Sequence, residues 1–134
     1  MMISTRGRYA LRVMIDLAEN TSDKYIPMKE VAERQKLSLK YLERILPSLV
    51  KGGFVEGVQG KFGGYKLVKA PEDCIVGDIL RTTEGDLAPV SCLECGCEPC
   101  GNANGCRTRP VWVGLQNVIT EYLDSVTLAD LMEK

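Results

Sequence analysis

The sequence contains no histidine. Histidine is the commonest general base in enzymes and the usual partner that activates a nucleophilic side chain. Its absence also removes mixed cysteine and histidine ligation of a metal ion. We therefore do not expect ordinary hydrolytic catalysis, and we do not expect the chain to be an enzyme.

Long hydrophobic runs are missing too. The stretch that follows residues 1–6 is amphipathic, and no run approaches the length of a membrane span. On this pattern we expect no secretory signal. We expect a cytoplasmic protein with no membrane partner. Because the cytoplasm is reducing, closely spaced cysteines there indicate metal binding or redox chemistry more often than structural disulfides.

Cysteine, by contrast, is concentrated, since five of the six cysteines lie within residues 92–106. They are Cys92, Cys95, Cys97, Cys100 and Cys106. Thiolates select zinc, copper(I) and iron-sulfur clusters. The spacing does not specify zinc, which stays an alternative to a cluster, and a thiol sensor that forms disulfides on oxidation is a third option. Cys74 stands apart, and we expect it to be a small buried residue.

The charges are unevenly distributed along the 134-residue chain. Residues 1–70 carry 13 Lys and Arg against 7 Asp and Glu, whereas residues 71–134 carry 4 against 11. A basic first half is typical of a protein that binds a polyanion, although chance segregation of surface charge is the alternative. The length suits one compact domain with an extension.

The pattern of residues 1–70 predicts a winged helix-turn-helix domain. Apolar residues at helical spacing predict helices over residues 5–19 and 28–35, and Ser38 is a good N-cap for a third helix that ends near residue 51. Six apolar residues should face the core from this third helix: Leu39, Leu42, Ile45, Leu46, Leu49 and Val50. Residues 54–56 and 65–68 predict two short strands around a glycine-rich hairpin. Two helices, a turn, a third helix and such a wing define the fold, which is mainly α with a small β wing.

Residues 71–134 are predicted to form a sensor and dimerisation region. A short helix should end near residue 83, followed by the cysteine loop 92–106, a long helix at about 108–124 and a last short helix with a capping box from Thr127 to Asp130. The long helix carries an apolar stripe made of Val111, Trp112, Leu115, Val118, Ile119 and Tyr122. Core packing is one explanation. A seam between two copies is the more economical one, because residues 1–70 nearly complete a domain, and a dimer would present two recognition helices to a palindromic site.

The predicted DNA contacts lie on the third helix and on the wing. The polar residues of the helix are Ser38, Lys40, Tyr41, Glu43, Arg44, Ser48 and Lys51. On the wing, Gln59, Lys61 and Lys66 supply polar side chains, and Gly63 and Gly64 belong to a glycine-rich tip that allows close approach of the backbone. Cations there can pair with phosphates, Arg44 with guanine, and Glu43 with a cytosine amino group. An ordinary solvated helix face and a tight hairpin are the alternatives.

Four segments together resemble the Rrf2-type winged-helix regulators. They are residues 4–10 (STRGRYA), 38–43 (SLKYLE), 60–65 (GKFGGY) and 106–112 (CRTRPVW). The resemblance implies a homodimeric transcription factor, often a repressor, which binds double-stranded DNA. Its IscR-like members sense iron-sulfur or redox status through a cluster, whereas its CymR-like members control cysteine metabolism without one.

In IscR-like members a 2Fe-2S cluster is held by three cysteines, the last two separated by five residues, and by a histidine three positions later. By that resemblance Cys100 and Cys106 match the last pair, and Cys92 is taken as the first ligand, with Cys95 or Cys97 as alternates. Arg109 occupies the histidine position and cannot ligate, because its guanidinium stays protonated. An extra cysteine, Glu94, Glu98 or a group of the partner subunit is left as the fourth ligand.

The leading hypothesis is a dimeric DNA-binding regulator that responds to an iron-sulfur cluster. The same module controlled by zinc, by thiol oxidation or by a partner enzyme in the CymR manner is the first alternative. A small iron-sulfur electron carrier is the second, but it leaves the polar residues of the third helix and the wing unexplained.

Overall fold

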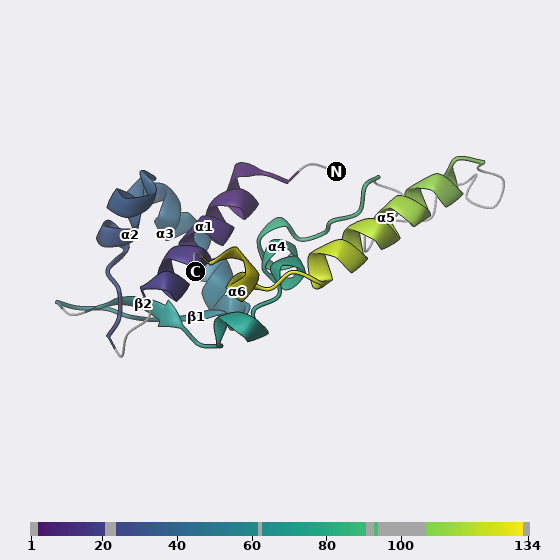
Figure 1. Ribbon diagram of the computed structural model, residues 1–134. Helices are drawn as coiled ribbons and strands as arrows, with labels where there is room; N and C mark the ends of the chain where they lie inside the picture. The colour runs from purple at the N-terminus through teal and green to yellow at the C-terminus, as the bar shows by residue number, and fades with distance from the viewer. Residues whose placement is uncertain (1–2, 21–23, 62, 91–92, 94–106, 133–134) are drawn as a thin grey trace.

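The computed structural model describes residues 3–20, 24–61, 63–90, 93 and 107–132. Along the chain follow α1 (Thr5–Glu19), α2 (Met28–Gln35), α3 (Leu39–Lys51), β1 (Val55–Val58), β2 (Gly64–Leu67), the 3-10 turn η1 (Pro71–Asp73), α4 (Val76–Glu84), α5 (Arg109–Asp124) and α6 (Leu128–Leu131). Figure 1 shows a compact body formed by all of these except α5, which projects from it as a single rod. The predicted fold, mainly α with a small wing, is confirmed.

The core of the body surrounds α1. Ala10, Val13, Met14 and Leu17 repeat every three or four residues, and none of them is more than 1% exposed. Buried side chains of α2 and α3 close around this face, together with Phe54. The predicted helices over residues 5–19 and 28–35 coincide with α1 and α2, because each segment carries its own buried apolar face at helical spacing.

The third helix begins where Ser38 caps it, since the Ser38 hydroxyl accepts a hydrogen bond from the Tyr41 backbone N–H at 3.4 Å. The helix continues unbroken through Pro47. Two of its predicted core residues are wrong: Leu39 is 39% exposed and Val50 44%. The stripe formed by Leu42, Ile45, Leu46 and Leu49 fills the space against α1. Successive residues of a helix are rotated by about 100° around its axis, which places Leu39 and Val50 beyond the edge of this stripe.

The wing is an antiparallel pair in which Val55 faces Leu67 and Val58 faces Gly64. Its strands are shifted by one or two residues from the predicted ones. On the outer side of β2, Ile26 and Tyr65 exchange two backbone hydrogen bonds of 2.9 Å, which attaches the wing to the chain that leads into α2. Gly64 has a φ of +150°, and a Cβ there would lie 2.3 Å from the Ile26 carbonyl oxygen, so only glycine fits this approach.

The end of the chain returns to the body. The Val76 N–H donates to the Val126 carbonyl at 2.9 Å, and the Leu128 N–H donates to that of Cys74 at 2.8 Å. The predicted capping box at Thr127 and Asp130 begins α6, and Leu128 is fully buried beside α1. Residues on both sides of residue 70 therefore contribute to the buried core. The predicted boundary between a DNA-binding domain and a sensor region lies at residue 70, and this division of roles stays a prediction.

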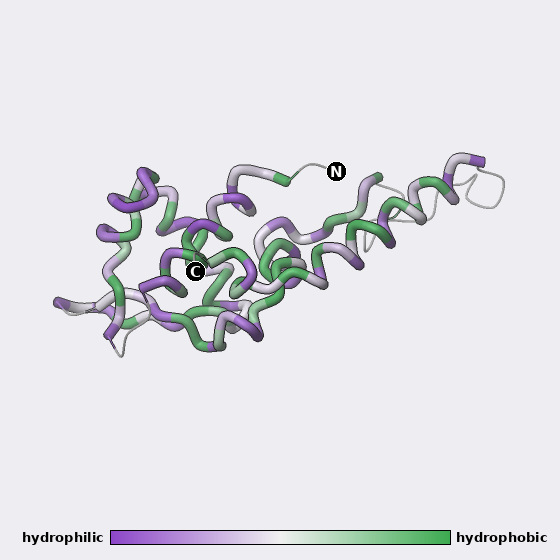
Figure 2. The backbone as a smooth tube through the Cα atoms, in the orientation of Figure 1, coloured by the Kyte–Doolittle hydropathy of each residue, from purple (hydrophilic) through white to green (hydrophobic). Residues whose placement is uncertain are grey.

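The long helix α5 contributes no buried residue. Its C-terminal end packs against α4 (Figure 1), where Arg81 pairs with Asp124 at 2.6 Å and with Asp78 at 3.0 Å. Figure 2 shows apolar and polar residues alternating along its whole projecting length. Within the described ranges, no helix is both long and apolar enough to cross a membrane.

Cys74 is buried, as the sequence predicts, with no exposed surface and no disulfide. Burial raises the pKa of its thiol, because removal from water disfavours the thiolate. A higher pKa leaves less thiolate at neutral pH, so iodoacetamide should modify Cys74 of the native protein at least about a hundredfold more slowly than Cys74 of the unfolded chain. Mass spectrometry of the Cys74 peptide measures both rates, and equal rates would contradict the burial.

Candidate nucleic-acid interface

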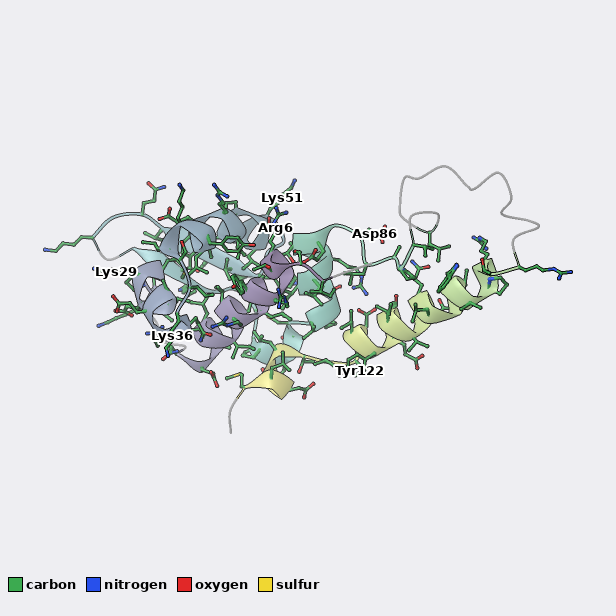
Figure 3. The ribbon with its side chains drawn as sticks, turned by 90° about the horizontal axis from the view of Figure 1, so that it is seen from above. Arg6, Lys29, Lys36, Lys51, Asp86 and Tyr122 are labelled. Carbon is green, nitrogen blue, oxygen red and sulfur yellow. The ribbon has the colours of Figure 1, made fainter. Side chains whose placement is uncertain are left out.

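The outward face of α3 is polar and cationic. Lys40, Glu43, Arg44 and Lys51 are exposed, and Lys51 reaches out from the body in Figure 3. None of the three cations forms an ion pair with another residue that the structure describes. Their charge is therefore available to a polyanion, whose condensed counterions they would replace.

A surface hollow lies at the N-terminal half of this face. It has a volume of about 220 Å³ and is lined by Ser38, Lys40, Tyr41 and Arg44. A hydroxyl, a phenol ring and two cations at one hollow suit hydrogen bonding to base edges as well as phosphate contact. Ser48 is half-buried, one turn beyond Arg44. The structure thus gathers Ser38, Lys40, Tyr41 and Arg44 at one place, and Glu43 and Lys51 lie on the same helix outside the hollow.

The wing presents its polar tip to solvent. Gln59 and Lys61 are exposed, and the Gly63 N–H donates to the Gly60 carbonyl at 3.0 Å to close the turn. Gly63 and Gly64 are half-buried and serve the turn and the approach to Ile26. Gln59 and Lys61 are therefore exposed side chains of the wing that could contact DNA.

Lys66 differs from the sequence prediction, because its ammonium is engaged within the domain. It lies 3.4 Å from a Glu56 carboxylate oxygen and 4.8 Å from the centre of the Tyr25 ring. The cross-strand register places Lys66 opposite Glu56, which explains the pair. Lys66 keeps 34% of its side chain exposed, so a phosphate contact by this residue stays a prediction.

A polar network under the helix-turn-helix was missed by the sequence analysis. Asp16 of α1 is 2% exposed. Its two carboxylate oxygens share the Arg34 Nε–H, at 3.2 and 3.0 Å, and Oδ1 also accepts a hydrogen bond of 2.7 Å from the Arg34 Nη2. The bond to Asp16 raises the pKa of the Arg34 guanidinium. One signal was available: a carboxylate between Val13 and Leu17 in an apolar stripe requires a partner when it is buried.

The cysteine loop lies outside the described residues, and with it Cys92, Cys95, Cys97, Cys100, Cys106, Glu94 and Glu98. The predicted ligand set therefore stays a prediction. In the part that is described, no three His, Cys, Asp or Glu side chains gather as a metal site. Arg109, at the histidine position, is the first residue of α5 and is exposed.

The apolar stripe of α5 divides into two lines. Val111, Leu115, Val118 and Tyr122 are 60%, 42%, 63% and 66% exposed, whereas Trp112 and Ile119 are half-buried. Seven residues make nearly two helical turns, so the pairs 111/118 and 115/122 form one face and the pair 112/119 lies beside it. Figure 3 places Tyr122 and Asp86 on opposite sides of α5, so this face points away from the chain that enters the loop.

Comparison with known sequences matches nearly the whole chain. A family model, Rrf2, described as an iron-dependent transcriptional regulator, matches residues 3–134. The regulator CymR of Bacillus subtilis is 38% identical over 131 residues, which are 98% of this chain and 89% of that protein. The regulator IscR of Aliivibrio salmonicida is 33% identical over 132 residues, which are 98% of this chain and 77% of that protein.

Solved structures share the fold. That of CymR (YrzC), the global cysteine regulator of B. subtilis, has a TM-score of 0.78 at 36% identity and covers 98% of this chain and 95% of its own. That of T. potens IscR has a TM-score of 0.75 at 37% identity and covers 98% of this chain and 85% of its own. The likeness thus extends over the helix-turn-helix, the wing and the C-terminal helices.

Proposed function

The chain belongs to the Rrf2 family of transcriptional regulators, and on that premise we propose that it is a homodimeric DNA-binding repressor that responds to a cluster held by its cysteine loop. The cationic face of α3 beside the wing, which forms no ion pair with the residues described, is the observation that carries the DNA-binding part. In a winged helix this face enters the major groove and the wing lies along the neighbouring backbone. Lys40, Arg44 and Lys51 then bind phosphates or guanine, and Gln59 and Lys61 contact the flanking strand.

Replacing Arg44 with glutamine should weaken binding to any duplex roughly tenfold at about 0.1 M salt, because each lost phosphate contact lowers the salt slope of log K by about one. Titration of a labelled duplex at several salt concentrations measures both quantities. Arg109→Gln, at the far end of α5 (Figure 1), removes the same charge away from the interface and is the matched control. Equal losses in both variants would mean that total charge, not the α3 face, binds DNA.

Two copies are joined, in this proposal, through the exposed face of α5. Four large apolar side chains in line on a helix with no buried residue favour a helix-to-helix seam. A two-fold axis along such a seam brings two α3 helices to the half-sites of a palindromic duplex. The partner is a second copy of this chain, and the target is double-stranded DNA.

The sensor is proposed to be the loop between α4 and α5. Its thiolates suit an iron-sulfur cluster, for which Cys92, Cys100 and Cys106 are the proposed ligands, with Cys95 and Cys97 as alternates. The guanidinium of Arg109 does not fit the fourth position, so that ligand is assigned to a further cysteine, to Glu94 or Glu98, or to the partner subunit. When bound, the cluster supplies a centre whose loss or oxidation changes how the loop is ordered.

The loop is well placed to affect DNA binding. It starts after α4, which packs on both α1 and α3, and ends at α5. An ordered loop would favour one placement of α4 and α5, and hence one spacing of the two α3 helices. This ordering changes the affinity for DNA only if DNA binds the ordered and the disordered states differently.

Metal and sulfide analysis separates this function from its alternative. Both relatives named IscR and relatives named CymR match the chain at similar identity, so control by zinc, by thiol oxidation or by a partner enzyme is the second candidate. Protein purified without oxygen should contain iron and sulfide in equal amounts and absorb visible light. Zinc, or no metal even after attempted reconstitution, would leave the second candidate.

A further inference from the structure

The first helix holds the end of α2 in place at the turn before the recognition helix. Arg12 of α1 donates from Nη2 to the Gln35 backbone carbonyl and from Nε to the Gln35 side-chain oxygen at 3.3 Å. The Gln35 side-chain nitrogen donates to Asp16 at 3.1 Å. Because Gln35 is the last residue of α2, these three hydrogen bonds between α1 and Gln35 fix the point at which the turn begins.

The same face of α1 also holds the start of α3. Tyr9 meets Tyr41 edge to face, with ring centres 5.3 Å apart and planes at 78°. Arg12 lies over the Tyr9 ring, 5.5 Å from its centre, and so joins the two contacts into one unit. Tyr41 is in the first turn of α3 and lines the hollow with Ser38, Lys40 and Arg44.

Both ends of the turn are therefore attached to one face of α1, on which Tyr9, Arg12 and Asp16 follow at helical spacing. Asp16 anchors this face because it is buried and bound by Arg34 as well as by Gln35. Between the two ends only Lys36, with a left-handed φ of 56°, Leu37 and Ser38 connect α2 to α3. The angle of α3 relative to α2 thus depends on these contacts.

We propose that Tyr9 and Arg12 are positioning residues for base recognition: they set the start of α3 so that the side chains of the hollow meet base edges. The inference rests on the proposed DNA-binding function. A phosphate contact tolerates a small shift, because a charge acts over a distance, whereas a hydrogen bond to a base edge is lost within less than an ångström. Loosening the turn should then lower discrimination between duplexes more than it lowers general affinity.

Arg12→Lys and Arg12→Gln test the proposal. The probes are a duplex that the wild-type protein selects from a random-sequence pool and a shuffled duplex of equal composition. The ratio of the two affinities should fall about tenfold in both variants, since lysine keeps the charge but not the planar fork that reaches both Gln35 oxygens. The salt slope should stay unchanged in both. If Arg12 contacts a phosphate instead, Arg12→Lys keeps the wild-type ratio and Arg12→Gln lowers both affinities with a slope smaller by about one.

Tyr9→Leu provides an independent test without a charge change. It removes the edge-to-face contact and should lower the ratio of the two affinities about tenfold. Tyr9→Phe keeps the ring and should keep the wild-type ratio. An unchanged ratio in Tyr9→Leu would overturn the role of Tyr9, and should that variant fail to fold, the Arg12→Lys result decides. A wild-type protein that selects no duplex would refute the proposed function itself, which is a different outcome from variants that discriminate as well as the wild type.

Discussion

Replacing Val118 with aspartate is expected to convert the proposed dimer into a monomer and to weaken binding to a palindromic duplex by at least about a hundredfold. Val118 is 63% exposed at the centre of the α5 face. In a helix-to-helix seam it faces its symmetry mate, so two carboxylates would be placed together in a desolvated contact, which strongly opposes association. The monomer also loses the effective concentration by which one bound half-site recruits the other, a gain of about 10²–10⁴. Sedimentation equilibrium measures the mass, and a titration measures the affinity.

Asn117→Asp is the matched control for this variant. It adds the same charge to the neighbouring exposed position of the same helix, about 100° away from the apolar face. This variant should remain dimeric and bind as the wild type does. If Val118→Asp also kept the mass of a dimer, the α5 face would not be the seam, and its exposed side chains would need another occupant.

Periodicity explains why so much of the body was predictable. Helices α1 and α2 coincide with the predicted ranges, since their apolar residues recur at the helical period and Met28 follows a proline. The capping signals at Ser38 and Thr127 were confirmed because each depends only on residues within the next turn. The same logic failed at the edges of a stripe, where Leu39 and Val50 are apolar yet lie outside the space that α1 fills.

Contacts between distant segments were not predictable from spacing. Glu84, at the end of α4, accepts hydrogen bonds of 3.0 Å from the Ser4 and Gly7 backbone N–H groups and so caps α1 from another helix. The Arg34–Asp16 and Lys66–Glu56 pairs likewise depend on which faces meet. A sequence pattern gives the face that a residue occupies but not its partner, so the pairing of Lys66 with Glu56 was not predicted.

Replacing Cys106 with alanine should abolish the visible absorption of the protein purified without oxygen, together with its iron and sulfide. The cluster hypothesis makes Cys106 a ligand that the neighbouring arginines cannot replace. Cys100→Ala should give the same loss, and among Cys92, Cys95 and Cys97 the variant that also loses its iron identifies the first ligand. Cys74→Ala is the matched control, because Cys74 belongs to the buried core of the body. This variant should leave the visible absorption intact.

The fourth ligand can be tested at Arg109, where the family pattern places a histidine. If this position faces the cluster, Arg109→His should supply an imidazole, shift the visible bands and change the rate at which air bleaches them, since the ligand set alters both potential and lability. An unchanged spectrum in Arg109→His would mean that another cysteine, a carboxylate or the partner subunit already fills the site. A Cys106→Ala protein that kept its full iron and sulfide would refute the ligand assignment, and zinc in place of iron in the parent protein would refute the cluster.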